Sequence, residues 1–153
     1  MIDDLYSARI LTLVANMPRA GRLAEPDASS EKHAKLCGSR IVVDVVVQDG
    51  KVVDYAQDVS ACALGQASAA ILGQNIIGAE LSDIELARDS LAAMLKTNGS
   101  PPAGRFAELA VLEPVKDYPA RHASTLLAFD ATVEAVRKAT GVGETRTSTA
   151  GAA

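Results

Sequence analysis

The clearest alternation of hydrophobic and polar positions lies between residues 40 and 59, RIVVDVVVQDGKVVDYAQDV. Two runs rich in β-branched residues flank Asp49-Gly50, a dipeptide that favours tight hairpin turns because both positions accept positive φ. The pattern therefore predicts an antiparallel hairpin with one apolar face on each strand. We expect that face to carry Ile41, Val43, Val45 and Val47 on the first strand and Val53, Tyr55 and Val59 on the second, with Asp44, Asp54 and Asp58 towards water.

Apolar residues spaced three and four apart predict a helix near the N-terminus, over residues 2–14. Pro18 and Gly21 end it, because neither residue continues a helix well. The polar segment 24–35 that follows has no clear period. A loop and an edge strand are both compatible with it.

Two helices are predicted directly after the hairpin. The first begins near residues 60–62, ends by Gly78, and consists of unusually small residues, which let a helix approach a sheet closely. The second carries Ser82 and Glu85 in capping-box spacing, and Asn98-Gly99 suits its C-terminal end.

The C-terminal part of the chain reads as less regular until its last helix. We expect a short piece around Phe106–Leu112, then a loop framed by Pro114 and Pro119, then a helix over residues 121–139. The tail, residues 140–153, has nothing to bury and is expected to be disordered. The residues of the last helix expected in the core are Leu126, Leu127, Val133 and Val136.

This order of elements indicates an α+β fold, with a small antiparallel β-sheet and helices packed on one face. The chain has 153 residues, 48% of them hydrophobic. That is enough for one domain with a proper core but not for several. We expect a single domain over residues 1–139.

Charge and composition exclude two classes of partner. The net charge is −4, no basic run is present, and tryptophan is absent, so a nucleic-acid surface is not expected. No apolar run reaches the roughly 20 residues that span a bilayer. The N-terminus carries acidic residues where a signal peptide would be basic. We therefore expect a cytoplasmic protein without a membrane partner, whose thiols stay reduced.

The two cysteines, Cys37 and Cys62, are the main candidates for chemistry. Cys37 stands at the mouth of a predicted strand, and Cys62 at the start of a predicted helix, where unpaired N–H groups stabilise a thiolate. The hairpin between them can bring both thiols to one end of the sheet. The alternative is that both are inert buried residues, and the spacing alone favours it because no C-x-x-C pair is present.

The remaining side chains offer no complete metal site or catalytic signature. A zinc site needs two ligands besides the cysteines, and His33 and His122 are the only histidines. His33 is expected to be solvated, and His122, at the start of the last helix, is either a surface group or a ligand. No phosphate loop, Ser-His-Asp order or dinucleotide fingerprint is present, so the residues do not indicate an enzyme.

Three segments together resemble one protein family. The block LCGSRIVVDVVVQDGKVVDYAQDVSACALGQASAAILGQNIIG, residues 36–78, is similar to iron–sulfur cluster scaffolds of the IscU/SufU/NifU N-terminal-domain type. In that family a C-G-D motif opens one strand, and a second cysteine begins a helix reading C-A-x-x-x-A-S-A-S. MPRAGRL, residues 17–23, looks like the family's P-R-N-x-G stretch, and YPARHASTLLAF, residues 118–129, resembles a SufU-type motif.

The resemblance implies a SufE/NifU-like fold and a ligand set from which this chain departs. Cys37 and Cys62 match two ligand cysteines, whereas Ser39 stands at the aspartate of C-G-D and Ser124 at the third cysteine. A serine hydroxyl is a far poorer ligand than a thiolate or carboxylate. His122, two residues before Ser124, is the further candidate for a metal ligand.

The resemblance implies a scaffold or carrier that accepts sulfur from a cysteine desulfurase and transiently holds iron or an iron–sulfur cluster. Cys62 would be the sulfur acceptor, with Cys37 beside it, and recipient apo-proteins would be the other partners. Two alternatives stay open. One is a zinc-dependent sulfur-transfer partner of a desulfurase, and the other is a metal-free docking or regulatory module that kept the fold and lost the site.

Overall fold

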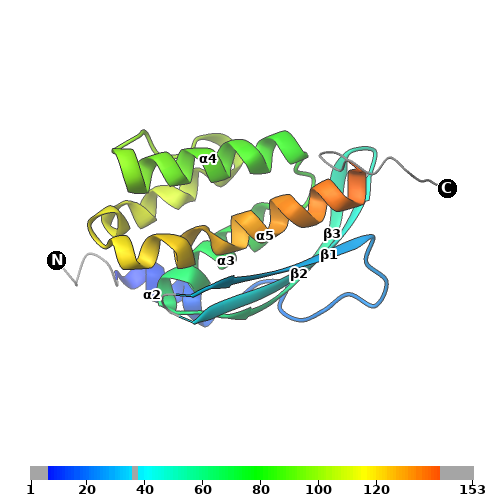
Figure 1. Cartoon of the computed structure of the whole chain (residues 1–153), viewed down its shortest axis with the longest axis horizontal. Helices are drawn as coiled ribbons and strands as arrows, with labels where there is room; N and C mark the ends of the chain where they lie inside the picture. Colours follow the sequence, from blue (N-terminus) through cyan, green and yellow to red (C-terminus); the bar gives the residue numbers. More distant parts are fainter. Residues whose placement is uncertain (1–6, 36–37, 142–153) are drawn as a thin grey trace.

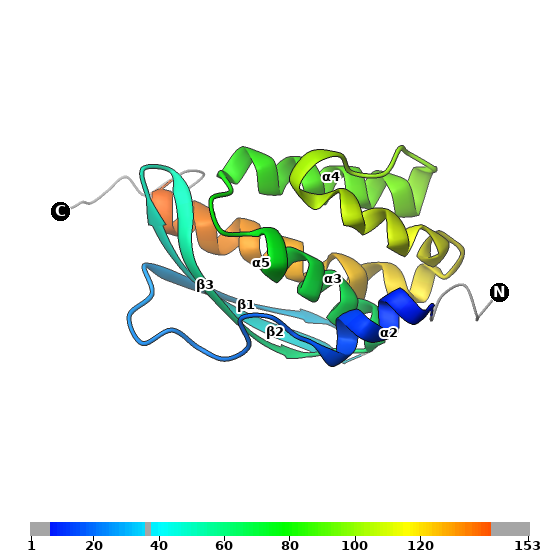
Figure 2. The ribbon, with the colours of Figure 1, turned by 180° about the vertical axis from the view of Figure 1, so that it is seen from behind.

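The computed structural model describes residues 7–35 and 38–141. One layer is a three-stranded antiparallel sheet in the order β1-β2-β3 (Figure 1). Helices α3 and α5 pack on one face of this sheet, and α4 with the 3-10 segment η1 lies beyond them (Figure 2). The predicted α+β class is thus confirmed. The bounds are α2 Ala8–Ala15, β1 Ala28–Ala34, β2 Ser39–Gln48, β3 Lys51–Ser60, α3 Ala63–Asn75, α4 Leu81–Thr97, η1 Gly104–Asp117, η2 Pro119–Arg121 and α5 His122–Thr140.

The predicted hairpin forms between β2 and β3. Asp49 and Gly50 occupy its turn with φ of 54° and 77°, the positive values that the dipeptide favours. Ile41, Val43 and Val45 are buried on the face towards the helices. The first strand therefore presents the apolar face that its alternation predicts.

The second strand departs from the predicted alternation at one residue. The register shifts after Val46, which pairs with Asp54, so that Val47 pairs with Val52. Val52 is fully buried and Val53 is 42% exposed, so the prediction that Val53 shares the inner face with Tyr55 is wrong. A β-bulge inserts one extra residue into a strand, so the inward and outward positions are exchanged on the far side of the bulge.

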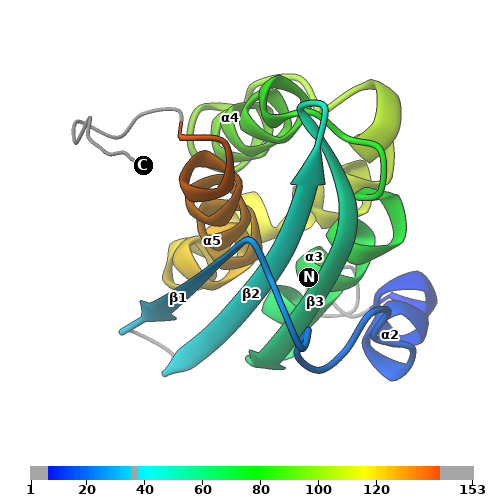
Figure 3. The same ribbon diagram turned by 90° about the vertical axis from the view of Figure 1, so that its right-hand side faces the viewer.

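The outward acidic residues of the hairpin also differ from one another. Asp54 and Asp58 are exposed, as predicted, but the side chain of Asp44 is fully buried. The segment before β1 crosses the outer face of the sheet at β2, as Figure 3 shows, and covers this residue. The prediction that Asp44 faces water is therefore wrong, because a polar loop can cover a sheet face that alternation assigns to solvent.

The buried carboxylate of Asp44 is held by several hydrogen bonds. Arg22 donates from Nε at 2.6 Å and from a terminal nitrogen at 3.0 Å, one bond to each carboxylate oxygen. The Leu23 N–H donates at 3.0 Å and the Ser29 hydroxyl at 2.5 Å. Burial raises the pKa of Asp44, but these bonds outweigh it, so the pKa lies below its ordinary value.

The N-terminal part contains a shorter described helix than the sequence predicts. Ser7 caps α2, since its hydroxyl accepts from the Ile10 N–H at 3.3 Å, and Ile10 and Leu13 are buried. The predicted first residues of this helix lie outside the described residues. The sequence of segment 24–35 is compatible with a loop and with an edge strand. In the structure this segment contains the edge strand β1.

Helix α4 begins differently from the prediction. Glu80, not Ser82, is the N-cap residue, and its N–H donates to the Asp83 carboxylate at 2.9 Å. Glu85, the other half of the predicted capping box, instead accepts from Arg137 of α5 at 2.6 Å. The end is as predicted, since Asn98 adopts the left-handed conformation with φ of 58°.

The segment before α5 is more ordered than predicted. A 3-10 run covers Gly104–Asp117 and passes through Pro114, where the sequence predicts a loop. Phe106 anchors it in the core, with its ring edge-on to Phe129 at 5.5 Å between centroids. Helix α5 follows, and all four of its predicted core residues, Leu126, Leu127, Val133 and Val136, are buried.

Helix α3 lies at the centre of the molecule and is buried on nearly all sides. Its small residues, such as Ala67, Ala69 and Ala70, are fully inaccessible to solvent.

Over the described part of the chain, no helix combines the length and the apolar character needed to cross a membrane. The predicted tail lies outside the described residues, apart from Thr140, which ends α5, and Gly141, which caps it.

The Asp44 cluster generates a stability prediction. We expect Asp44→Asn to lower the free energy of unfolding by about 2–3 kcal/mol, because charge-assisted bonds to a buried group are lost. The folded-state pKa of Asp44 is depressed, so its contribution is full above the unfolded value of about 3.9 and disappears as the pH falls through the folded value. Denaturant unfolding of both proteins between about pH 7 and 3 measures this.

The matched control is Asp58→Asn, which changes the same chemistry at an exposed position of β3. It should alter the unfolding free energy by less than about 0.5 kcal/mol. Equal losses in both variants, or an Asp44→Asn deficit that does not shrink in acid, would contradict the structural role assigned to the Asp44 carboxylate.

Candidate functional site

Three of the residues singled out by sequence meet at one end of the sheet. Ser39 begins β2, Cys62 is the N-cap residue of α3, and Ser124 lies in the first turn of α5. The Ser124 hydroxyl oxygen is 3.0 Å from that of Ser39 and 3.3 Å from the Cys62 sulfur. Both serines are buried and Cys62 is half-buried, so the thiol is the accessible member of the cluster.

The chemistry of these groups fixes the direction of the hydrogen bonds once Cys62 is ionised. A thiolate only accepts, so the single hydrogen of the Ser124 hydroxyl is donated to sulfur. The oxygen of Ser124 then accepts from Ser39. The two hydroxyls therefore form a short chain of hydrogen bonds that ends on the thiolate.

A glycine makes this meeting of elements possible. A Cβ atom at Gly65 would lie 2.6 Å from the Ser124 hydroxyl oxygen and 3.1 Å from the Ser124 carbonyl oxygen. Both distances are shorter than ordinary contacts, so α3 and α5 can approach this closely only with hydrogen at position 65. Sequence reasoning noticed the small residues of α3 but did not assign Gly65 this role.

The other predicted thiol, Cys37, lies outside the described residues. Its assignment as a ligand stays a prediction. The neighbouring backbone is fixed on the strand side, where Ser39 pairs with Ala34 across the end of the sheet.

The two histidines lie in different environments. His33 is exposed on β1, with its Nε2 atom 3.2 Å from Glu31, in agreement with the expected solvated side chain. His122 is buried, and its Nε2 atom donates to the carbonyl oxygens of Val115 at 3.0 Å and Lys116 at 3.3 Å. The surface alternative for His122 is therefore wrong, and its assignment as a ligand stays a prediction.

The described donors do not form a conventional metal site. Within residues 7–35 and 38–141, no three His, Cys, Asp or Glu side chains gather closely enough to hold a metal ion. The site contributes one thiol and two hydroxyls there. Alcohol oxygens bind soft or borderline metals weakly compared with thiolates.

The segment MPRAGRL, residues 17–23, lies along the open edge of β3. The Gln57 N–H donates to the Arg19 carbonyl, and the Gly21 N–H donates back to the Gln57 carbonyl at 2.8 Å. The buried Gln57 amide also donates to Pro18 and to Ala69 of α3. These contacts give the segment a structural role, since they fasten it to both β3 and α3.

Comparison with known sequences identifies a family. Residues 5–125 match the sequence profile of the NifU-like N terminal domain. The chain is also 27% identical over 134 residues to the iron–sulfur cluster assembly scaffold protein IscU of Thermotoga maritima. This alignment covers 88% of the chain and 94% of that protein.

Comparison with solved structures agrees. A nitrogen-fixing NifU-like protein (N-terminal) from Brucella abortus is 51% identical, with a TM-score of 0.90, and the match covers 92% of this chain and 97% of that one. FiSufU from Fervidobacterium islandicum AW-1, assigned to the SUF system of iron–sulfur cluster assembly, has a TM-score of 0.80. Its match covers 88% of this chain and 98% of that one, and at 20% identity it supports the fold alone.

The close approach at Gly65 generates a testable coupling. We expect Gly65→Ala to lower the free energy of unfolding by about 1–3 kcal/mol, because the added methyl group overlaps Ser124. In a Ser124→Ala background the cost should be smaller, since the nearest clashing atom is gone. Chemical denaturation of the wild type, the two single variants and the double variant gives the coupling energy.

A strictly additive result would contradict direct contact between position 65 and the Ser124 hydroxyl. The matched control is Gly141→Ala combined with Ser124→Ala. Gly141 caps α5, and no atom of the described residues lies within 4 Å of the place that an added methyl group would occupy, so its strain is independent of Ser124.

Proposed function

Because this chain belongs to the family of NifU-like N-terminal domains, we propose that it is a scaffold or carrier of iron–sulfur cluster assembly. Its cargo is sulfur together with iron or a cluster, held transiently and passed to recipient apo-proteins. The sulfur donor is a cysteine desulfurase. We place this activity in the cytoplasm and assign a carrier role, without turnover of a substrate of its own.

The observation that carries the proposal is the convergence of Ser39, Cys62 and Ser124. These residues come from three elements far apart in the sequence, and the resemblance designates their positions as ligand positions. Ordinary core packing does not require two hydroxyls and a thiol to meet at the end of a sheet. The convergence therefore supports a scaffold site in which hydroxyls stand at two ligand positions.

The donor set of the chain supports loose rather than tight cargo binding. Iron–sulfur clusters are usually held by four thiolates, and the chain has two cysteines, Cys37 and Cys62. The remaining ligands would come from an external thiol, from a partner protein or from His122. Incomplete coordination by one chain suits a carrier, because the cargo has to leave.

In this proposal Cys62 is the first acceptor of sulfur. Its thiolate attacks the outer sulfur of a cysteine persulfide on the desulfurase. A new S–S bond forms on Cys62, the donor's S–S bond breaks, and the donor cysteine leaves as a thiolate. The half-buried position of Cys62 supports access to such a donor, and the Ser124 hydroxyl, 3.3 Å from its sulfur, is placed to donate a hydrogen bond to the thiolate.

One second function is favoured by a specific contact. The hydroxyls of Ser39 and Ser124 bond to each other at 3.0 Å, so these buried polar groups are satisfied without any metal. A metal-free docking or regulatory module on the same fold would be stable in this arrangement. Metal analysis of the protein separates this alternative, and also the zinc-dependent one, from the carrier.

The proposal predicts that both cysteines are required for cargo. A Cys37→Ala and Cys62→Ala double variant should fold normally, yet lose at least about 90% of bound iron or persulfide after incubation with a desulfurase, cysteine and ferrous iron, because thiolates are the nucleophiles and ligands. Iron and sulfide analysis and intact-protein mass spectrometry measure the loss. The matched control is Ser68→Ala, which alters a buried position inside α3 and keeps both cysteines.

Retention of iron and persulfide by the double variant would refute the carrier role. Wild-type protein that takes up neither, yet binds the desulfurase, would favour the docking module. Stoichiometric zinc that disappears in the double variant would favour the zinc-dependent alternative.

Restoring the substituted ligands tests whether the pocket still has ligand geometry. We expect Ser39→Asp with Ser124→Cys to raise zinc affinity by at least about 100-fold, since two weak donors become a carboxylate and a thiolate. Competition with a chromophoric chelator measures the change. The same pair of changes combined with Cys62→Ala should lose most of the gain, and an unchanged affinity would mean that the three positions no longer converge as ligands.

A further inference from the structure

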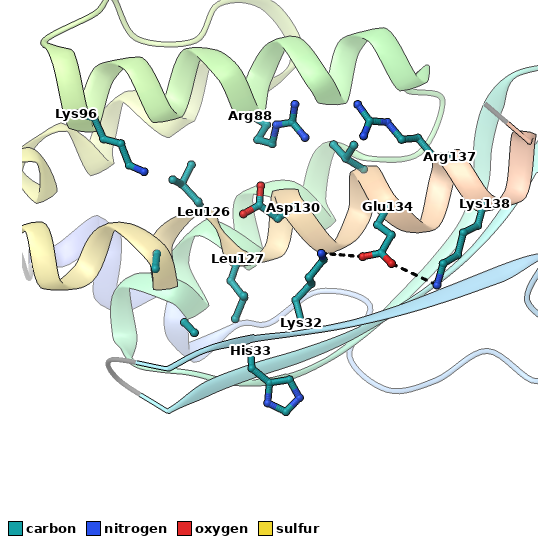
Figure 4. Close-up of a pocket in the computed structure, with 13 residues that line it drawn as sticks. Lys32, His33, Arg88, Lys96, Leu126, Leu127, Asp130, Glu134, Arg137 and Lys138 are labelled. Atoms are coloured by element: carbon teal, nitrogen blue, oxygen red, sulfur yellow. Dashed lines mark ion pairs between the residues drawn. The ribbon is translucent and has the colours of Figure 1, made fainter. Parts of the chain in front are cut away.

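A second polar surface lies on the outer side of α5 and is separate from the cysteine site. It is an open groove of about 570 Å³ between α4, α5 and the edge strand β1 (Figure 4). Its cationic lining residues come from all three elements, in a chain whose net charge is −4. They are Lys32 from β1, Arg88 and Lys96 from α4, and Arg137 and Lys138 from α5.

The acidic residues of the groove only partly neutralise these cations. Glu134 lies 2.9 Å from Lys32 and 3.5 Å from Lys138, so one carboxylate serves two ammonium groups. Arg137 is paired outside the lining, with Glu85 at 2.6 Å. The end of the groove near Lys138 therefore keeps a positive excess.

The rest of the groove, with Arg88 near its middle and Lys96 at the end beside Leu126, has the same excess of positive charge (Figure 4). Arg88 contacts the exposed neighbour Asp89 at 3.1 Å, and across the described segments Lys96 forms no ion pair. Asp130 lies between them on α5 (Figure 4). Burial raises the pKa of Asp130 above its ordinary value, although Arg88, Lys32 and Lys96 favour its charged form. The one carboxylate here is thus partly desolvated, whereas Lys96 is exposed and Arg88 is half-buried.

The shape of the groove selects a chain-like ligand. Its lining on α5 runs from Ala123 to Lys138, which is about 22 Å at 1.5 Å per residue. An extended segment of six or seven residues, at about 3.3 Å each, fits the length.

We propose that this groove binds an extended, acidic segment of a partner protein. Carboxylates of the segment lie against Lys96 at the near end, against Arg88 in the middle and against Lys138 at the far end. The near end reaches Ala123, next to Ser124, and Ala34, which pairs with Ser39. A partner held here is therefore positioned beside the cysteine site. This docking does not depend on the chemistry of that site.

The experiment uses a fluorescein-labelled glutamate octapeptide and the full chain without added metal. Fluorescence anisotropy should show binding that weakens as salt rises. Lys96→Glu should weaken binding about fivefold, because it reverses a charge that no ion pair within the described segments offsets. Lys51→Glu is the control, since it makes the same charge change at the exposed first residue of β3, which does not line the groove, and should alter the affinity by less than about twofold.

Several outcomes would overturn the proposal. Equal losses in Lys96→Glu and Lys51→Glu would mean general electrostatic attraction without a groove. Equal affinity for free glutamate or inorganic phosphate would mean a small-anion pocket, and equal affinity for a single-stranded oligonucleotide of the same charge would mean an unselective polyanion surface. Absence of peptide binding at low salt would remove the docking site. None of these results bears on cargo binding by the cysteines, so the two proposals can fail separately.

Discussion

The close approach of α3 to α5 is the constraint on which the site depends. Where the two helices cross near Gly65, the hydrogen in place of a side chain lets the first turn of α5 lie against the start of α3. That contact places Ser124 within hydrogen-bond distance of both Cys62 and Ser39. A methyl group at this position would push apart two helices that both pack into the hydrophobic core. The packing of the two helices and the geometry of the site therefore depend on the same residue, Gly65.

The serines at two ligand positions change how the site relates to folding. A buried carboxylate or thiolate without a metal ion would be an uncompensated charge, which is costly in an interior. Ser39 and Ser124 are neutral, and each can give and accept a hydrogen bond. The described part of the site is thus internally satisfied. The stability of this part of the fold therefore does not require a bound metal ion.

How far the sequence predicts the structure depends on whether the signal is local. The Asp49-Gly50 turn, the apolar face of β2 and the core residues of α5 follow from local patterns, and they are confirmed. Three features do not follow from local patterns, because they depend on how distant segments pack against one another. They are the bulge that exposes Val53, the burial of Asp44 and the capping of α4 by Glu80. For the site, the resemblance singles out Ser39, Cys62 and Ser124, and the structure brings these three side chains into contact. The basic groove was missed because its cations lie on three elements and form no run in the sequence.

The hydrogen bonds of His122 have a consequence for its tautomer. Carbonyl oxygens only accept, so the Nε2 atom that faces Val115 and Lys116 carries a hydrogen whether the ring is neutral or charged. In the neutral ring the lone pair therefore resides on Nδ1, and the orientation of the imidazole is fixed by η1 before anything approaches it. Metal-binding histidines commonly have such a backbone-anchored nitrogen opposite the ligating one. Any cation that this imidazole binds would therefore have to take the lone pair of Nδ1.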